Sequence, residues 1–297
     1  MAAPSAASST APAPYRSDLP AEAPTRAEVM PKARAENFTV ASLLLPPAQR
    51  RALLGIYGFA RLVDDAGDEA SGDRSALLDW LERDVERMFV GRAVHPLLRR
   101  VGPSALAYGM PRGPFLRLIE ANRVDQRVSR YATYDELAAY CELSANPVGE
   151  LVLYVFGAAT DERIRWSNSV CTALQLAEHW QDVGEDFRRG RVYLPREDCE
   201  RFGVREDDLA AEAPSDELRQ LLAFELARAR RLLDEGTPLV RSLSGLARLA
   251  VAGYVGGGRA ALDEIEASGY DVLRRSPKAG RAPRLAQTAA VLREAGR

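Results

Sequence analysis

The stretch LQLAEHWQDVGEDFRRGRVYLP, residues 174–195, decides the fold and points to a site. Glu178, Asp182 and Asp186 follow one another at steps of four residues, so a helix would carry all three carboxylates on one face. Arginines come directly afterwards at positions 188, 189 and 191, in a segment broken by glycine. Carboxylates beside cations favour a metal ion that meets an anionic substrate.

A similar acidic run, ARLVDDAGDEA at residues 60–70, lies much earlier in the chain. In a helix Asp64 and Asp68 are one turn apart, with Arg61 and Tyr57 behind them on the same face. Like charges at this spacing destabilise an isolated helix, so a bound cation would compensate. Mg²⁺ prefers hard oxygen ligands, so two such runs on facing helices predict a magnesium and diphosphate site. The alternative, a solvated helix face without a metal, stays open.

The sequence around these runs is helical in character. From residue 36 to about 273, Ala, Leu, Arg and Glu dominate, and apolar residues recur every third or fourth position. Proline and glycine clusters divide this region into roughly eight to ten helices with short connections. The pattern predicts an all-α fold in a single domain.

The two ends of the chain differ from this region. Residues 1–34 are rich in Ala, Pro and Ser, and we expect a disordered leader without the apolar core of a secretory signal. We place the helical domain at residues 35–275 and a basic, partly helical tail at residues 276–297. No apolar stretch of the sequence is long enough to span a membrane.

Composition limits the classes of function. The 297 residues carry 40 Lys and Arg against 42 Asp and Glu, a net charge of −2, which argues against a bulk electrostatic binder of nucleic acid. Two histidines and three widely spaced cysteines do not suit a zinc cage or a disulfide framework. The cysteine content fits a reducing, cytoplasmic location. Any bound metal must therefore be held by carboxylates.

The sequence resembles the squalene/phytoene synthase family over residues 36–275. The resemblance rests on ARLVDDAGDE, on YCELSANPVGE at residues 140–150, and on the block at residues 174–195. It implies an isoprenoid-synthase array of helices around a central cavity. It also implies that Mg²⁺ bridges the two aspartate-rich motifs to the diphosphate of a prenyl substrate.

Within the family, ENFTVAS at residues 36–42, SANPVG and WQDV resemble the hydroxysqualene synthase branch of hopanoid biosynthesis. Glu178 stands where the family has a metal-binding Asn, and Gln181 stands at an Arg position. These departures fit an enzyme that handles only presqualene diphosphate. The resemblance thus implies a Mg²⁺-dependent carbon–oxygen lyase that forms hydroxysqualene and diphosphate from presqualene diphosphate and water, without NADPH.

The resemblance also assigns roles to single residues. The implied metal ligands are Asp64, Asp68, Glu178, Asp182 and Asp186. The implied substrate contacts are Tyr57, Arg61, Gln181, Arg191, Tyr193 and Phe38, the last in the hydrocarbon pocket. Tyr140 would lie near the carbocation, so the implied catalytic set is Tyr140, Asp64, Asp68 and Asp182. His179 is expected to pack rather than to bind a metal.

Two other functions remain open at this point. One is the head-to-head condensation of two farnesyl diphosphates to presqualene diphosphate, squalene or dehydrosqualene, by a prenyltransferase. The other is a non-catalytic helical scaffold at a membrane surface. The lyase would need a partner enzyme that supplies presqualene diphosphate, and so apolar a substrate suggests peripheral contact with the inner leaflet of a membrane. We expect no nucleic-acid partner.

Overall fold

The computed structural model describes residues 19–34 and 45–296, and these form an all-α structure. The first group of helices is α1 (Arg26–Val29), η1 (Met30–Arg34), α2 (Pro47–Asp68), α3 (Arg74–Phe89), α4 (Pro96–Ala107), α5 (Gly113–Asp125), α6 (Tyr134–Ser144) and α7 (Asn146–Val155). The second is α8 (Asp161–Gln181), α9 (Val183–Arg188), α10 (Arg196–Phe202), η2 (Glu206–Ala210), α11 (Asp216–Gly236), α12 (Pro238–Ser242), α13 (Gly245–Ala267) and α14 (Arg281–Ala295). The predicted all-α fold is confirmed.

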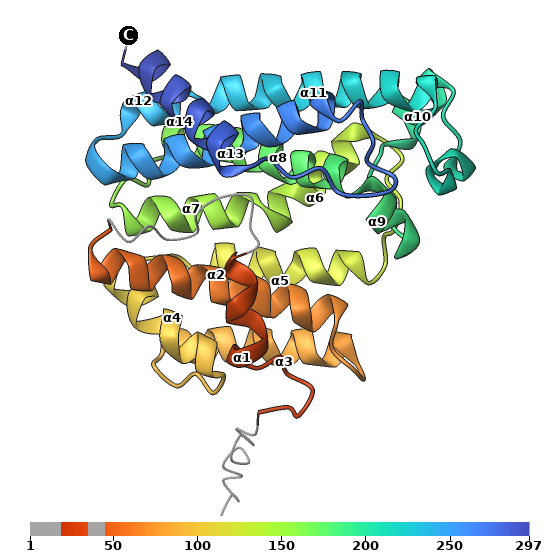
Figure 1. The fold of residues 1–297 in the computed structure, drawn as a ribbon. Helices are drawn as coiled ribbons and strands as arrows, with labels where there is room; N and C mark the ends of the chain where they lie inside the picture. The colour runs from red at the N-terminus through yellow and green to blue at the C-terminus, as the bar shows by residue number, and fades with distance from the viewer. Residues whose placement is uncertain (1–18, 35–44, 297) are drawn as a thin grey trace, which may run out of the picture.

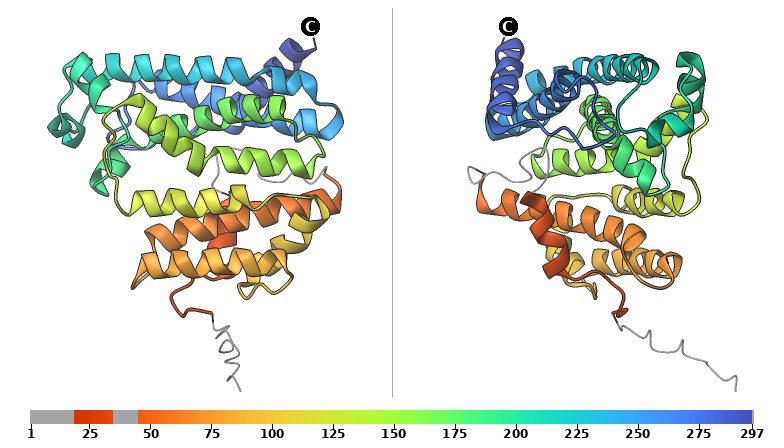
Figure 2. Two further views of the ribbon diagram at one scale, coloured as in Figure 1. Left: turned by 180° about the vertical axis from the view of Figure 1, so that it is seen from behind. Right: turned by 45° about the vertical axis from the view of Figure 1, so that its right-hand side comes forward.

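The helices pack as two groups with α6 and α7 between them (Figures 1 and 2). One group holds α2 to α5, and the other holds α8, α11, α13 and α14. Each group has its own apolar core, and α7 contributes buried residues to both. The arrangement therefore encloses space between α2 on one side and α8 and α13 on the other.

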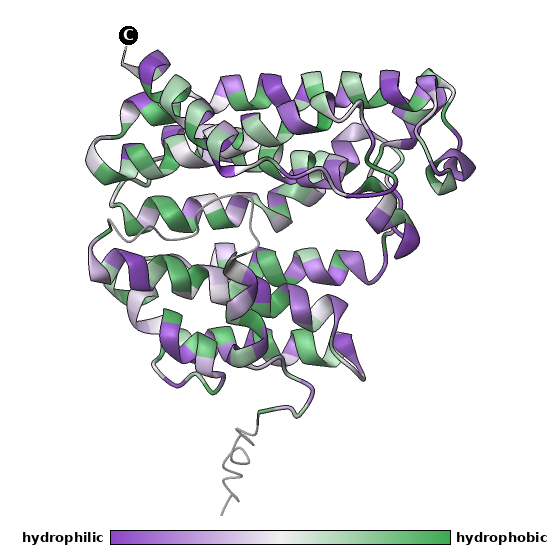
Figure 3. Ribbon diagram, in the orientation of Figure 1, coloured by the Kyte–Doolittle hydropathy of each residue, from purple (hydrophilic) through white to green (hydrophobic). Residues whose placement is uncertain are grey.

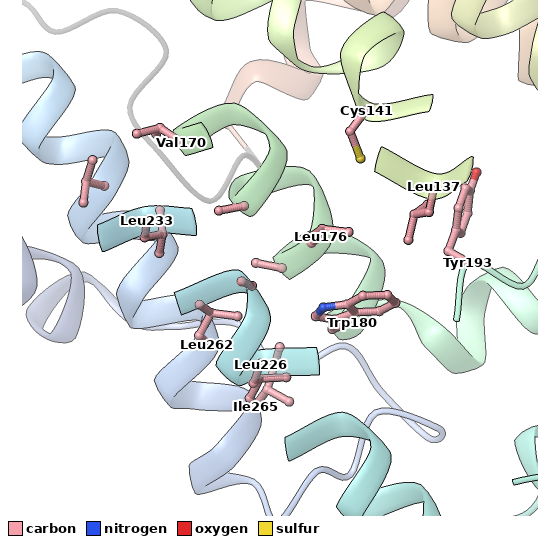
Figure 4. Close-up of a cluster of buried hydrophobic side chains, with 14 of the residues drawn as sticks. Leu137, Cys141, Val170, Leu176, Trp180, Tyr193, Leu226, Leu233, Leu262 and Ile265 are labelled. Carbon is pink, nitrogen blue, oxygen red and sulfur yellow. The ribbon is translucent and has the colours of Figure 1, made fainter. Parts of the chain in front are cut away.

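Apolar stripes on the long helices explain this packing. Figure 3 shows hydrophobic residues on the inward faces and polar residues on the outside. In the first group Phe59 of α2 meets Phe115 of α5 edge to face, with ring centroids 5.0 Å apart. In the second group Trp180 of α8 is fully buried, and side chains from α8, α11 and α13 meet in one cluster (Figure 4).

Residues 19–34 fold, which differs from the disordered leader expected there. Thr25 and Glu28 form a capping box at the start of α1, and Val29 is fully buried. Lys32 Nζ lies 2.9 Å from Asp65 Oδ1 on α2 and 2.8 Å from Glu69 Oε2. The Ala- and Pro-rich composition obscured this short capped turn. Residues 1–18 of the expected leader lie outside the described residues.

The basic tail contains α14, which packs along α13. Val291 is fully buried, and Arg259 Nη1 of α13 lies 2.8 Å from Glu294 Oε2 of α14. A Cβ on Gly256 would lie 2.5 Å from the backbone nitrogen of Thr288, so the close approach requires glycine there. The helical part of the tail is thus an integral part of the second group.

None of the helices in the described residues is long and apolar enough to cross a membrane.

Candidate functional site

A cavity of about 250 Å³ lies between α2, α7, α8 and α13. Most of its wall is apolar, formed by Leu53, Ile56, Leu118, Val148, Val152, Leu153, Val170, Leu174, Leu239, Val251 and Ala261. The wall also includes Tyr57 at the middle of α2, Arg61 and Asp64 further along α2, and Glu178 near the end of α8, and we call this part the charged end. Such a chamber suits a hydrocarbon with an anionic head group.

Asp64 faces the cavity from the C-terminal half of α2. Asn122 Nδ2 of α5 donates a hydrogen bond to Asp64 Oδ1 at 3.1 Å. Burial raises the pKa of Asp64 to about 7, and the charges of Asp68 and Asp125 act in the same direction. A cation bound nearby would favour the ionised form of this carboxylate.

The neighbouring Asp65 faces away from the cavity. Its Oδ1 lies 2.9 Å from Arg61 Nε and 2.9 Å from Lys32 Nζ. Asp64 therefore lies in the cavity wall, whereas Asp65 forms ion pairs with Arg61 and Lys32. Arg61 thus lies in the cavity wall and is also tied to Asp65.

The second acidic motif spans two helices and not the single helix that the sequence predicted, although the Asp182 nitrogen still donates to the Glu178 carbonyl and the Asp186 nitrogen to the Asp182 carbonyl. Helix α8 ends at Gln181, and α9 begins at Val183. The backbone nitrogen of Gly184 donates to the carbonyl of Val272 at 3.2 Å, in the segment that leads to α14. This tertiary contact interrupts the helix at Asp182, so Glu178 and Asp186 belong to separate helices.

Gly184 leaves no room for a side chain, because a Cβ there would lie 2.2 Å from the carbonyl oxygen of Leu273. We expect Gly184→Ala to lower the free energy of unfolding by about 2 kcal/mol or more and to displace Asp182 and Asp186. Urea unfolding and an activity assay would measure both effects. Gly253→Ala is the control, since no atom lies within 4 Å of a Cβ at that position of α13. Equal urea midpoints for the two variants would contradict the expectation.

Arg191 connects the two acidic motifs. Its Nη2 atom lies 2.6 Å from Asp68 Oδ1, and its side chain is only 22% exposed. Burial acts to lower the pKa of Arg191, but the hydrogen bond to Asp68 and the negative charges of Asp68 and Asp125 raise it overall. Burial and the charge of Asp182 raise the pKa of Asp186 to about 7, while Arg191 acts to lower it. The guanidinium of Arg191 therefore interacts with acids of both the first and the second motif.

The carboxylate of Asp182 has two properties that fit a metal ligand. Asp182 has a raised pKa, mainly through burial, and its buried Oδ1 atom has no hydrogen-bond partner among the described residues. Within the described part of the chain, however, no three His, Cys, Asp or Glu side chains converge on one point as a ready-made metal cage. The donor set fits a divalent ion that substrate phosphates help to hold, rather than a closed protein cage.

Four aromatic rings lie beside this site. Tyr140 is buried and donates a hydrogen bond to Asp125 Oδ2 at 2.7 Å. His179 stacks on Tyr193 with ring centroids 3.7 Å apart, so the predicted packing role of His179 fits its position. Tyr131 completes the group against Tyr140 and Tyr193. The rings brace the Asp125 and Arg191 side of the site.

Asp125 and Asn122 are site residues that the sequence did not reveal. Burial raises the pKa of Asp125 to about 6, and the charge of Asp68 adds to that rise. Both residues lie on α5, outside any acidic run, so no local signal marks them. The close packing of α5 against α2 is reflected in the sequence by Gly67, because a Cβ at this position would lie 2.3 Å from Asn122 Oδ1.

Of the expected substrate contacts in the described residues, Tyr57 and Arg61 line the cavity wall, whereas Gln181, Arg191 and Tyr193 do not. Gln181 is 1% exposed, and its Nε2 donates to the carbonyl of Pro277 at 2.6 Å, so it fastens the segment before α14. The expected direct contact between Gln181 and the substrate is corrected accordingly. Phe38 lies outside the described residues.

Comparisons with known proteins agree on one family. The family described as squalene/phytoene synthase matches residues 31–283. A 15-cis-phytoene synthase from Synechococcus elongatus is 34% identical over 255 residues, which cover 81% of this chain and 83% of that protein. The structure of squalene synthase HpnC from Alicyclobacillus acidocaldarius is 43% identical, with a TM-score of 0.75, and covers 81% of this chain and 91% of its own.

A dehydrosqualene synthase solved with a ligand shares the fold at a TM-score of 0.79 and 24% identity. The match covers 90% of this chain and 95% of that one.

Proposed function

The chain belongs to the squalene/phytoene synthase family, and we propose that it converts presqualene diphosphate and water to hydroxysqualene and diphosphate. The observation that carries the proposal is the apolar cavity with Arg61, Asp64 and Glu178 at its charged end. This arrangement suits a C30 hydrocarbon chain with a diphosphate head. The 43% identity to squalene synthase HpnC supports a substrate of that size.

We propose that Mg²⁺ binds between the two acidic motifs. The proposed ligands are Asp64 and Asp68 of α2 with Glu178, Asp182 and Asp186, and each ion would take one or two of these carboxylates together with substrate phosphates. When bound, the metal stabilises the negative charge that develops on the diphosphate as its carbon–oxygen bond breaks. The raised pKa values of Asp64 and Asp186 support this assignment, because a cation would keep both carboxylates ionised.

The chain's own residues perform the remaining tasks. Arg61 and Arg191 place positive charge near the leaving diphosphate. The apolar wall surrounds the carbocation and excludes bulk water. Tyr140 remains a predicted catalytic residue. Its phenol is neutral, because burial and the neighbouring Asp125 carboxylate raise its pKa well above the usual value. Its hydroxyl is held by Asp125, which fixes the ring beside the charged end.

A product assay tests the proposal directly. The purified protein is incubated with Mg²⁺ and either presqualene diphosphate or farnesyl diphosphate, without NADPH, and products are identified by gas chromatography and mass spectrometry. We expect hydroxysqualene from presqualene diphosphate and no C30 product from farnesyl diphosphate. Such a lyase would depend on a second enzyme for presqualene diphosphate, and its apolar substrate and product favour peripheral contact with a membrane.

Condensation of two farnesyl diphosphates is the second candidate function. It is favoured by the 34% identity to a phytoene synthase, which extends over 81% of the chain. A C30 product from farnesyl diphosphate alone would establish this prenyltransferase and exclude the restricted lyase. A scaffold without catalytic activity would release no diphosphate from either substrate.

A further inference from the structure

A lysine of the N-terminal turn contacts the two acids that face Arg61, and we propose that Lys32 is a positioning residue that keeps Arg61 able to bind the substrate diphosphate. The inference rests on the proposed function and adds to it a residue of η1. Lys32 is not among the described residues that line the cavity. It acts by binding Asp65 and Glu69, which would otherwise compete with the diphosphate for Arg61.

Two carboxylates lie beside Arg61 along α2. Arg61, Asp65 and Glu69 follow one another at steps of four residues, so the three side chains share one face of the helix. Arg61 Nε lies 2.9 Å from Asp65 Oδ1, and Arg61 Nη2 lies 3.8 Å from Glu69 Oε1. Without a further cation, one guanidinium would therefore face two acids.

Lys32 supplies that further cation. Its Nζ atom donates to Asp65 Oδ1 at 2.9 Å and to both oxygens of Glu69 at 2.9 and 2.8 Å. Glu69 is thus held by Lys32, whereas its distance of 3.8 Å from Arg61 is too long for a hydrogen bond. The Asp65 side chain is only 4% exposed, so its charge depends on nearby cations more than a surface charge would.

The N-terminal turn is fixed against the first group of helices, which keeps Lys32 at this position. The turn contacts α2 (Figure 1). His95 Nε2, at the start of α4, lies 3.0 Å from the carbonyl oxygen of Pro24. Val29 is fully buried, and a Cβ on Gly58 of α2 would lie 3.1 Å from the sulfur of Met30. Lys32 is therefore part of a packed element and not of a free terminus.

Arg61 is the group through which Lys32 would act on the substrate. Arg61 lines the cavity at the charged end, and its charge acts to lower the pKa of Asp64. The guanidinium therefore lies near a proposed metal ligand, where a diphosphate would bind. If Glu69 closed on Arg61, the acid would offset the positive charge and compete with the diphosphate for the same donors. Lys32 prevents this by occupying both oxygens of Glu69.

The test is calorimetric titration of Lys32→Met with inorganic diphosphate and Mg²⁺, together with kcat/KM for presqualene diphosphate. We expect the Kd for diphosphate to rise about 10-fold and kcat/KM to fall by a similar factor. Lys32→Arg keeps the charge and should stay within about 3-fold of the wild type. Arg112→Met is the matched control, because Arg112 forms an exposed pair with Glu86 at 2.7 Å, and its loss should change both quantities less than about 2-fold.

Glu69→Gln distinguishes a positioning role from a general effect of charge. If Lys32 acts by occupying Glu69, Glu69→Gln alone should change diphosphate affinity less than about 2-fold, and Lys32→Met combined with Glu69→Gln should bind diphosphate within about 3-fold of the wild type. If Glu69→Gln instead tightens binding as much as Lys32→Met weakens it, Lys32 acts only through its field and the inference is overturned. A double variant as weak as Lys32→Met would show a purely structural role, which also overturns it.

The outcomes separate this inference from the proposed function. If the wild type makes hydroxysqualene and Lys32→Met binds diphosphate as tightly as the wild type, the inference is overturned and the function stands. If the wild type binds diphosphate but makes no hydroxysqualene, the proposed function fails, and the affinities of the Lys32 and Glu69 variants still decide the role of Lys32. If the wild type binds no diphosphate in the presence of Mg²⁺, both are overturned.

Discussion

Asp64→Asn is expected to slow Mg²⁺-dependent diphosphate release at least about 1,000-fold and to stabilise the metal-free protein at the same time. The loss of activity follows because Asp64 is the acid of the first motif that lines the cavity. An amide has no charge with which to hold a divalent cation against the diphosphate. Asn122 would still reach the side-chain oxygen that it contacts at 3.1 Å, so the local packing should survive.

The gain in stability follows from the sign of the pKa shift. Burial raises the pKa of Asp64 from 3.8 to about 7, so this carboxyl takes up a proton on folding in the absence of metal. Its contribution is therefore most favourable below about pH 4 and is lost as the pH rises towards about 7. About three pK units correspond to at most about 4 kcal/mol, and partial exposure reduces the expected gain at pH 8 to about 2 kcal/mol.

Urea unfolding with a chelator at pH 5 and pH 8, together with a diphosphate-release assay, measures both effects. The matched control is Asp65→Asn on the adjacent residue. Asp65 is buried and pairs with Arg61 and Lys32, so its loss should reduce stability at pH 8 by about 1 to 2 kcal/mol. We therefore expect the free energy of unfolding at pH 8 to rise in Asp64→Asn and to fall in Asp65→Asn. A destabilised Asp64→Asn with normal turnover would remove Asp64 from the site.

The comparison of these two acids shows how far the sequence determines the site. The alignment of Asp64, Asp68, Arg61 and Tyr57 along α2 was predictable because it depends only on the periodicity of one helix. The all-α fold was predictable for the same reason, since apolar residues at helical spacing recur along the chain. These are local properties that survive in any packing of α2.

The features that escaped prediction depend on contacts between distant segments. The interruption at Asp182 arises where Gly184 meets the carbonyl groups of Val272 and Leu273, far along the chain. The same segment turns Gln181 towards Pro277. Asp125 joins the site only because α5 packs against α2, and it carries no motif of its own. Regular spacing in residues 174–195 therefore suggested a single helix where tertiary packing produces two helices.

Arg191→Met is expected to tighten Mg²⁺ binding while reducing kcat/KM for the diphosphate substrate at least about 100-fold. The guanidinium of Arg191 bonds to Asp68 at 2.6 Å and lies in the field of Asp125. It therefore competes with a divalent cation for the same carboxylate. Removing it leaves the acids to repel one another, and Mg²⁺ relieves that repulsion more effectively, by about 10-fold in affinity.

The two effects have opposite signs because Arg191 has a different task once the substrate is present. The proposed function requires a cation near the leaving diphosphate, and a half-buried arginine beside both acidic motifs supplies it. Arg189→Met is the matched control. Arg189 is 68% exposed and pairs with Glu185 at 2.8 Å, so its loss should change both quantities less than about 2-fold.

Calorimetric titration with Mg²⁺ and steady-state kinetics on the same preparations measure the pair of effects. If Arg191 only braced the loop after α9, Arg191→Met would weaken Mg²⁺ binding together with turnover, because the acids of the two motifs would lose their alignment. If Arg191 instead leaves Asp68 to bind the diphosphate of the substrate, Arg191→Met would raise Mg²⁺ affinity while turnover falls. The direction of the change in Mg²⁺ affinity therefore decides between a structural ion pair and a group that acts on the substrate.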